Sequence, residues 1–118
     1  MKKTTGDDNS PKRGDVFWVN FDPTVGTEIK KIRPAIILSN NLFNRYLPRL
    51  LVVPLTSNVE RIFDFDAIVQ VQGKKGKAML DQVRAIDKTR LGKKIGSITA
   101  EELRDVERAL KEVFALNP

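Results

Sequence analysis

Gly26-Thr27-Glu28-Ile29-Lys30-Lys31-Ile32-Arg33-Pro34 is a polar, charged stretch that runs directly into the apolar residues Ala35-Ile36-Ile37-Leu38. The proline biases the preceding residue, Arg33, toward an extended backbone. The branched apolar residues behind it predict a buried strand from Pro34 to Ser39. We therefore expect the guanidinium of Arg33 to project from a rigid base, at the junction of a long loop and a buried strand.

A second apolar run, Leu50-Leu51-Val52-Val53-Pro54-Leu55, predicts another buried strand that ends at Thr56. The polar residues Thr56, Ser57 and Asn58 stand at its end. If the two strands are neighbours, these polar side chains lie beside Arg33. Pro54 predicts a bulge or a sheet edge near the end of this strand, because proline lacks the N–H group that a sheet ladder needs.

The other short elements follow from hydrophobic periodicity and turn residues. We expect a helical turn over Asn40–Arg45, with Leu42, Phe43 and Leu47 covering the sheet, and a basic hairpin tip over Gly73–Lys77. The remaining predicted strands are Val16–Phe21, Phe63–Val71, Ala78–Leu80, Gln82–Ile86 and Lys93–Ile98.

The C-terminal segment carries the clearest signal for a helix. Thr99 as N-cap and Glu102 three residues later form a capping box, and Ile98 and Leu103 stand at the positions of a hydrophobic staple. An apolar face at helical spacing is predicted to pack on the sheet, formed by Leu103, Val106, Leu110, Val113 and Phe114. The charged residues of this helix, Arg104 and Arg108 among them, are expected to face solvent.

Strands, a brief helix, more strands and a closing helix predict an α+β domain. We expect its mostly antiparallel sheet to curl into a small barrel, with the C-terminal helix packed on it. A chain of 118 residues is long enough for one core and too short for two. Residues 13–118 are therefore expected to form one domain, and residues 1–12 a disordered N-terminal tail.

Charge and composition limit the classes of function. Lysine and arginine total 21 against 15 acidic residues, which gives a net charge of +6. This charge favours a polyanionic or acidic partner, although a merely soluble basic surface explains it equally well. The absence of histidine and cysteine excludes histidine-based triads, disulfides and the usual zinc sites, so we expect neither a metal nor a cofactor. No apolar segment follows the N-terminal lysines, so a cytoplasmic protein without a secretory signal is expected.

Six short motifs stand in a distinctive order along the chain. They are Arg13–Val16, Phe21–Glu28, Arg33–Ala35, Val53–Ser57, Asp81–Lys88 and Arg90–Leu91. In this order and spacing they resemble the MazF/PemK family of toxin endoribonucleases, and the resemblance extends over residues 11–116. It implies a fold shared with the gyrase poison CcdB, a homodimer with the 26–34 loops near its seam, and a cognate MazE-like antitoxin. It also implies metal-independent, sequence-selective cleavage of single-stranded RNA by the 2′-hydroxyl, the activity of an mRNA interferase, leaving a 2′,3′-cyclic phosphate and a 5′-hydroxyl.

The resemblance also implies roles for particular residues. Arg33 and Thr56 match two catalytic positions of the family, and Glu28 matches a loop carboxylate that is a candidate general base. The chemistry of Arg33 agrees, because a guanidinium pairs with phosphate oxygens and stabilises the charge of a phosphorane without a metal. The predicted RNA-binding residues are Thr27, Lys30, Lys31, Ser57, Asn58, Asp81, Gln82 and Arg84. A solvated strand face explains Asp81, Gln82 and Arg84 equally well.

Two other classes of protein share parts of this pattern. A CcdB-like gyrase poison would have the same fold without cutting anything, and it would not need Arg33 and Thr56. A non-enzymatic small-barrel nucleic-acid binder would need only the basic surface, and such proteins usually display stacking aromatic side chains. This chain has one Trp, one Tyr and six Phe, mostly in apolar contexts, so the motif order favours the endoribonuclease.

Overall fold

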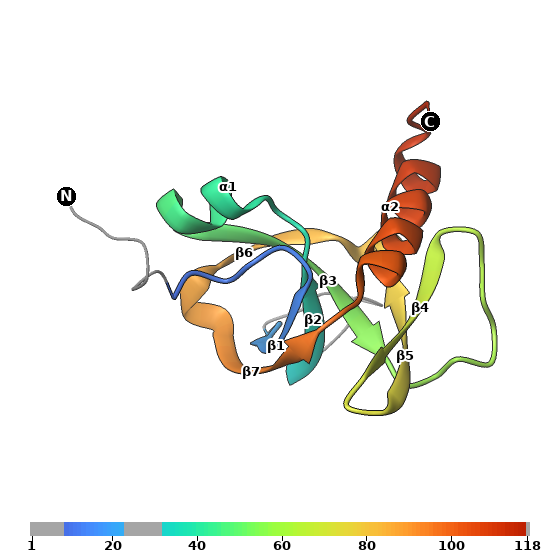
Figure 1. Cartoon of the computed structure of the whole chain (residues 1–118), viewed down its shortest axis with the longest axis horizontal. Coiled ribbons are helices and arrows are strands. Elements are labelled where there is room, and N and C mark those ends of the chain that lie inside the picture. The colour runs from blue at the N-terminus through green and yellow to red at the C-terminus, as the bar shows by residue number, and fades with distance from the viewer. Residues whose placement is uncertain (1–8, 23–31, 118) are drawn as a thin grey trace.

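The computed structural model describes residues 9–22 and 32–117, which form one curled sheet and two α-helices (Figure 1). The elements are β1 (Asp15–Asn20), β2 (Ile32–Ile37), α1 (Asn41–Tyr46), β3 (Arg49–Thr56), β4 (Asp66–Val71), β5 (Lys74–Met79), the 3-10 turn η2 (Leu80–Gln82), β6 (Arg84–Asp87), the 3-10 turn η3 (Lys88–Arg90), β7 (Leu91–Ser97) and α2 (Ala100–Phe114). Figure 1 shows α2 beside β4, and α1 at a distance from it.

All strand pairs of the sheet are antiparallel, and β3 joins its parts. The main path runs β4-β5-β3-β2-β1-β7, and β6 pairs with the first half of β3. The two ends of this path, β4 and β7, lie close to each other. Gln72 follows β4, and its Nε2 donates a hydrogen bond to Ile95 O of β7 at 3.2 Å. The predicted fold class, a mostly antiparallel curled sheet with a C-terminal helix, is therefore confirmed, and the sheet has the form of a half-barrel.

Pro54 lies in β3 at a place where one neighbouring strand gives way to another. On one side Pro54 pairs with Ala35 of β2. On the other side, the pairing of β3 with β6 stops at Val52, and its pairing with β5 starts at Leu55. This local break in the pairing takes the place of the bulge or outer edge that the sequence predicted, and β3 remains a central strand.

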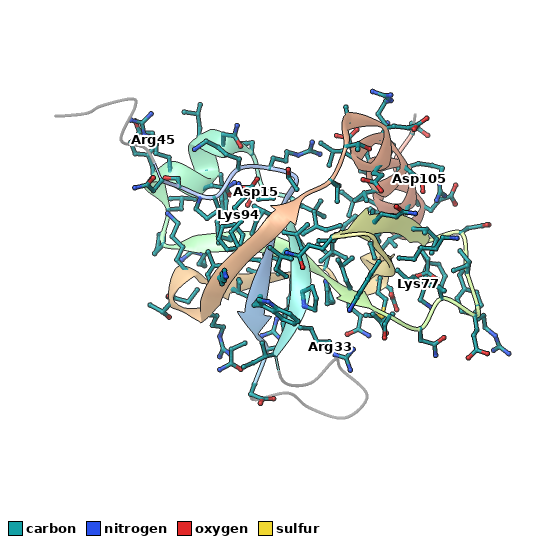
Figure 2. All side chains as sticks on the ribbon, turned by 60° about the horizontal axis from the view of Figure 1, so that its bottom comes forward. Asp15, Arg33, Arg45, Lys77, Lys94 and Asp105 are labelled. Atoms are coloured by element: carbon teal, nitrogen blue, oxygen red, sulfur yellow. The ribbon has the colours of Figure 1, made fainter. Side chains whose placement is uncertain are left out.

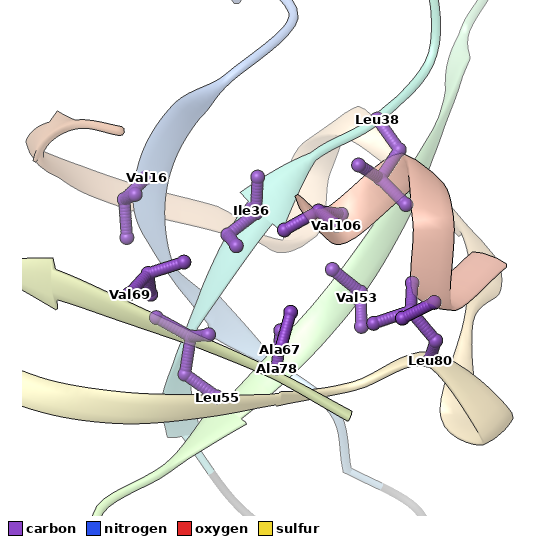
Figure 3. Packing of buried hydrophobic residues seen from close by; sticks show 11 residues of the cluster. Val16, Ile36, Leu38, Val53, Leu55, Ala67, Val69, Ala78, Leu80 and Val106 are labelled. Carbon is purple, nitrogen blue, oxygen red and sulfur yellow. The ribbon is translucent and has the colours of Figure 1, made fainter. Parts of the chain in front are cut away.

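Two apolar clusters share the residues of β2 and β3, which explains why both strands are apolar along their length. Ile36 and Val53 belong to the first cluster (Figure 3), whereas their neighbours Ile37 and Val52 belong to the second. The first cluster also contains Val106 of α2. Because burying one such side chain contributes about 1.5–3 kcal/mol, β2 and β3 form the rigid centre on which the ends of both strands are held.

Helix α2 begins as the sequence predicts. Glu102 N donates to Thr99 Oγ1 at 3.1 Å, and Thr99 N donates to Glu102 Oε1 at 2.9 Å, which completes the capping box. Val106 is fully buried, and the partly buried Leu103, Leu110 and Val113 pack against the same cluster. Phe114, predicted for this face, is instead 55% exposed, because the helix ends there and Ala115 turns into the left-handed conformation.

Helix α1 begins at the predicted N-cap, Asn40, whose side chain accepts a hydrogen bond from Phe43 N at 2.8 Å. The prediction that Leu42 covers the sheet was wrong, since its side chain is 70% exposed. The residue that α1 buries is Asn44, which donates to Ser39 O at 2.9 Å and accepts from the Ser39 hydroxyl. A satisfied polar network therefore anchors this helix, and hydrophobic periodicity does not reveal it.

Most strands are shifted by one or two residues from the sequence prediction, β2 and β7 among them, and three segments differ in a way that matters for the site or the turns. Strand β4 begins at Asp66 and not at Phe63, because Asp66 Oδ2 accepts from Phe63 N at 2.9 Å and closes a turn there. The lysine-rich segment predicted as a hairpin tip lies within β5, and Gln72 and Gly73 make the turn with φ values of 52° and 76°. Two central residues with positive φ are typical of the type I′ hairpin. The strand predicted from Gln82 begins two residues later, after the turn η2.

Residues 1–8 of the predicted N-terminal tail lie outside the described residues. Residues 9–12 lead into β1, and Lys12 N donates a hydrogen bond to Asp15 Oδ2 at 2.9 Å. Within the part of the chain that the structure describes, no helix has the length and apolar character needed to cross a membrane.

Candidate active site

A groove of about 640 Å³ opens at the end of the sheet where β2 begins and β3 ends. It is lined by Trp18, Ile32, Arg33, Pro34, Leu55, Thr56, Ser57, Val71, Gln72, Lys74, Lys75, Gly76 and Ile95. Leu55, Val71 and Ile95 also pack in the first apolar cluster, so the groove is the open end of that core. The polar side chains of the groove therefore stand on a packed, rigid base.

Arg33 and Thr56 meet in this groove because β2 and β3 are antiparallel neighbours. Ala35 pairs with Pro54, and the same register continued by two residues on each strand sets Arg33 opposite Thr56. Ser57 follows on the groove wall. Figure 2 shows Arg33 at the other end of the sheet from Arg45 of α1. The structure thus brings together the arginine and the hydroxyl groups that the sequence predicts side by side.

The Thr56 hydroxyl is held by the turn that follows β3. Asn58 N donates a hydrogen bond to Thr56 Oγ1 at 3.2 Å, and Glu60 N donates to Asn58 Oδ1 at 3.1 Å. One lone pair of Thr56 Oγ1 therefore has a backbone partner, and its hydroxyl hydrogen can be donated to a ligand oxygen in the groove. Asn58 does not line the groove, and its described contacts fix the turn.

Lys74 and Lys75 line the same groove, although the sequence predicts only a hairpin tip there and no binding role. Both side chains are exposed. The nearby Lys77 is largely buried, with its Nζ 3.8 Å from Asp66 Oδ2, and it donates a hydrogen bond to Arg61 O at 2.8 Å. No Asp or Glu side chain lines the groove among residues 9–22 and 32–117. The groove therefore concentrates positive charge from Arg33 and two lysines, and the run of lysines in the sequence was the signal for it.

Trp18 gives the groove an aromatic wall. Its side chain is 42% exposed, and its Cα pairs with Pro34 across β1 and β2. On β7, a Cβ at Gly92 would stand 3.3 Å from Trp18 Cβ and 3.4 Å from its carbonyl oxygen. Glycine at position 92 thus leaves room for Trp18, and the exposed indole offers a face on which a nucleobase can stack.

Several predicted site residues lie elsewhere or outside the described residues. Asp81 is exposed and Gln82 half-buried in η2, and Arg84 of β6 stands 5.6 Å from the centre of the Phe21 ring. None of these three lines the groove. The predicted loop residues Thr27, Glu28, Lys30 and Lys31 lie outside the described residues.

Asp87 and Arg90, which belong to the last two family motifs, have structural contacts in this fold. The Asp87 carboxylate accepts hydrogen bonds from the backbone N–H of Thr89 at 2.9 Å and from its hydroxyl at 2.8 Å, and these bonds lower the pKa of Asp87. The Arg90 guanidinium donates to Asn20 O at 3.0 Å and to Asp22 O. Arg90 therefore holds the chain at the end of β1, from Asn20 to Asp22.

A second hollow, of about 620 Å³, lies along α2. Its lining residues are Arg104, Glu107, Arg108, Lys111, Glu112, Ala115 and Leu116. Arg108 Nε donates to Asp105 Oδ1 at 2.8 Å, and this bond raises the pKa of Arg108. The same guanidinium donates to the carbonyls of Asp64 and Asp66 at 2.7 and 3.0 Å. These contacts tie α2 to the segment before β4.

Comparison with known proteins places the chain in a family. Residues 12–114 match the family described as PemK-like, MazF-like toxin of type II toxin-antitoxin system. The chain belongs to this toxin family. Endoribonuclease MazF9 of Mycobacterium tuberculosis is 34% identical over 109 residues, which cover 85% of this chain and 92% of that protein. Endoribonuclease EndoA of Bacillus subtilis is 32% identical over 111 residues, covering 89% and 95%.

Solved structures of MazF proteins share this fold. MazF of Deinococcus radiodurans superposes with a TM-score of 0.81 at 26% identity, covering 92% of this chain and 99% of that one. A mycobacterial endoribonuclease in complex with its cognate antitoxin gives a TM-score of 0.78 at 23% identity, covering 92% and 99%. The MazF-like fold predicted from the sequence motifs is therefore confirmed.

Proposed function

We propose that this MazF-like toxin is a metal-independent endoribonuclease that cleaves single-stranded RNA at selected sequences. The observation that carries the proposal is the meeting of Arg33 and Thr56 in a groove whose described lining holds three cations and no carboxylate. Such a groove attracts a phosphate backbone. The endoribonucleases MazF9 and EndoA, at 34% and 32% identity, support the same activity for this chain.

The reaction needs no nucleophile from the protein, because the RNA supplies its own 2′-hydroxyl. The 2′-oxygen forms a bond to the adjacent phosphorus and loses its proton to a base, while the bond from phosphorus to the 5′-oxygen breaks and that oxygen gains a proton. The products are a 2′,3′-cyclic phosphate and a 5′-hydroxyl. Glu28, outside the described residues, is our candidate for the base.

Arg33 and Thr56 act on the phosphate that reacts. The guanidinium of Arg33 donates paired hydrogen bonds to phosphate oxygens, and its charge is worth most when the phosphorane carries extra negative charge. The Thr56 hydroxyl donates a further bond to the same group. Among the described residues, no group of three His, Cys, Asp or Glu side chains could hold a metal ion. Arg33, the cation that meets Thr56 in the groove, is our candidate for stabilising this charge.

A cognate antitoxin and a second copy of this chain complete the proposed system, in the cytoplasm. A groove with Arg33, Lys74 and Lys75 suits an acidic antitoxin segment, which would compete with RNA. For the homodimer, a second candidate seam, besides the 26–34 loops expected from the family resemblance, lies at the other end of the sheet from Arg33. There α1 and the start of β3 expose Leu42, Tyr46, Leu47 and Leu51, with exposed fractions of 36–70%. Exposed apolar surface of this kind marks protein contacts. RNA cleavage that continues with saturating antitoxin, or light scattering that finds only monomers at micromolar protein, would contradict these partners.

The decisive test is cleavage of two matched RNAs in EDTA. One is all RNA and the other carries a single deoxynucleotide on the 5′ side of the bond that is cut. We expect the first to be cut with a cyclic phosphate product and the second to stay intact, because it lacks the 2′-hydroxyl. Cutting of the deoxy-substituted RNA, or loss of all-RNA cleavage in EDTA, would overturn the mechanism. A protein that binds both RNAs and cuts neither would be a binding module.

A further inference from the structure

The β4–β5 hairpin is the most cationic wall of the groove. Lys74 and Lys75 are exposed on it, and within residues 9–22 and 32–117 neither forms an ion pair. The third lysine of this segment, Lys77, is 13% exposed and contacts Asp66 and Arg61. The sequence Lys74-Lys75-Gly76-Lys77 thus divides into two lysines available to a ligand and one that holds the fold.

The hairpin is held in place at its sides and at its tip. Strands β4 and β5 pair without interruption from Asp66 with Met79 to Val71 with Lys74. The type I′ turn at Gln72 and Gly73 follows directly, and Gln72 Nε2 bonds to Ile95 O of β7 at 3.2 Å. Gly76 contacts Leu55 of β3, since a Cβ there would stand 3.7 Å from that side chain. The two lysines therefore extend from a fixed backbone on the wall of the groove.

The chemistry of these lysines differs from that of Arg33. A lysine ammonium is a compact charge on a flexible stem, which suits a phosphate whose position varies with the RNA sequence. A guanidinium is a planar fork, which suits one phosphate in a defined orientation. A single groove that carries both kinds of cation has groups for more than one phosphate.

We propose that Lys74 and Lys75 bind backbone phosphates of the RNA beside the phosphodiester that is cut, so that the β4–β5 hairpin is a phosphate-binding arm of the active site. This rests on the proposed endoribonuclease function. RNA fits the arm better than an acidic peptide does, because Trp18 exposes an indole face in the same groove and bases stack on such faces.

Binding remote from the reacting atoms has a defined kinetic signature. Contacts of the hairpin with flanking phosphates are the same in the ground state and in the transition state, so their loss raises KM and leaves kcat unchanged. Phosphate contacts also carry no sequence information, so their loss weakens all RNA sequences equally. Arg33, by contrast, acts on the phosphate that reacts and affects kcat.

The test compares K74Q/K75Q with R104Q/K111Q, which removes two positive charges from α2, outside the groove. The affinity of each variant and of the wild type for a non-cleavable RNA is measured over a range of salt concentrations, by quenching of the single tryptophan, Trp18. The RNA has one deoxynucleotide at the mapped cut position. Two lost phosphate contacts reduce the slope of log K against log salt by about 1.4 for a single strand. We expect this change in K74Q/K75Q, with raised KM and unchanged kcat, and the wild-type slope in R104Q/K111Q.

Three results would overturn the proposal. The first is an unchanged salt slope in K74Q/K75Q, and the second is a fall in kcat at constant KM. The third is unchanged RNA binding together with weakened binding of the antitoxin, which would make the hairpin an antitoxin contact. Thermal melting of each variant checks that the fold is intact. If the wild type neither binds nor cuts RNA, the proposed function is wrong. If the wild type cuts RNA and K74Q/K75Q has the wild-type salt slope and KM, only the hairpin proposal is wrong.

Discussion

The groove beside Arg33 and the hollow along α2 have nearly the same volume, about 640 and 620 Å³, but their charges are arranged differently. Along α2, three cations alternate with Glu107 and Glu112, and Arg108 is paired with Asp105. Arg13 also reaches this helix, with its guanidinium 2.6 Å from Glu107. In the groove, the described lining has three cations and no acidic side chain.

This difference teaches that size alone does not distinguish a binding site from a structural depression. Charges that alternate along a helix neutralise each other and are largely satisfied within the protein. Lys74 and Lys75, which form no ion pair within residues 9–22 and 32–117, leave their field for a ligand. The comparison therefore predicts that substitutions in the groove change activity and leave the fold intact, and that loss of a bonded charge along α2, such as Arg108, lowers stability and leaves activity intact.

The largest effect is expected for Arg33→Ala. Removing one group that stabilises transition-state charge slows catalysis by about 10²- to 10³-fold. Cleavage of the mapped RNA should fall by this amount, while the circular dichroism spectrum and melting temperature remain those of the wild type. The matched variant on α2 is Arg104→Ala, which should cleave at the wild-type rate. Near wild-type cleavage by Arg33→Ala would remove the distinction between the two hollows.

A smaller loss of cleavage is expected for Thr56→Val. Valine keeps the shape of threonine but has no hydroxyl, and one hydrogen bond to a charged group corresponds to a rate change of about 10- to 100-fold. The control is Thr56→Ser, which retains the hydroxyl and should recover most of the rate. Equal rates for the valine and serine variants in single-turnover cleavage would show that the hydroxyl takes no part.

Arg108→Ala tests the prediction for the hollow along α2, where we expect a loss of stability and no loss of cleavage. Its guanidinium joins Asp105 to the carbonyls of Asp64 and Asp66, so its loss should destabilise the protein. Because the side chain is 47% exposed, we expect a modest decrease in the free energy of unfolding, about 1–2 kcal/mol in urea denaturation. At a temperature where both proteins are folded, cleavage should be unchanged.

The control for this prediction is Arg104→Ala on the same helix. Arg104 is exposed, and substitutions at such positions change stability by less than about 0.5 kcal/mol. Equal destabilisation by the two variants would mean that helix propensity, and not the carbonyl contacts of Arg108, sets the loss.

The smallest effect is expected for substitution of Asp87, which lies in neither hollow. Its carboxylate accepts hydrogen bonds only from Thr89, two residues along the chain, among the bonds of the described residues. Hydrogen bonds from the Thr89 backbone and hydroxyl lower the pKa of Asp87 in the folded state. A lowered folded pKa stabilises the fold above the ordinary pKa of aspartate, and this contribution is lost as pH falls through the folded pKa. The melting temperature of Asp87→Asn should therefore be lower than that of the wild type at pH 7, and the difference should shrink toward pH 3. A difference that is constant with pH would contradict this linkage.

Parts of the fold were predictable where the signal is local in the sequence. The capping box of α2 lies within four residues, and the apolar runs of β2 and β3 mark strands whose two sides are both buried. Arg33 and Thr56 were predictable as neighbours because each stands at the end of such a strand. The family motifs add to this, since they predict the same two positions.

Other features depend on packing that no local pattern reveals. The lysines at 74 and 75 read as a solvated tip, because the sequence does not show that Gln72 and Gly73 make the turn and leave both lysines on the groove wall. Asn44 interrupts an apolar pattern, yet it is buried through its bonds to Ser39. The Arg90–Leu91 motif contributes to the family resemblance, and the sequence does not show that Arg90 bonds to the backbone at the end of β1.

The groove draws its lining from Trp18 near the start of the chain to Ile95 near its end. During synthesis the chain emerges from its N-terminus, and domains complete their folding only when all their strands are present. One side of β3 can pair only after β5 and β6 have been synthesised. The last residue of the groove lining, Ile95, belongs to β7. A ribosome making this toxin therefore carries no finished cleavage site while most of the message is being read, and the order of strands itself delays the moment at which the product becomes harmful.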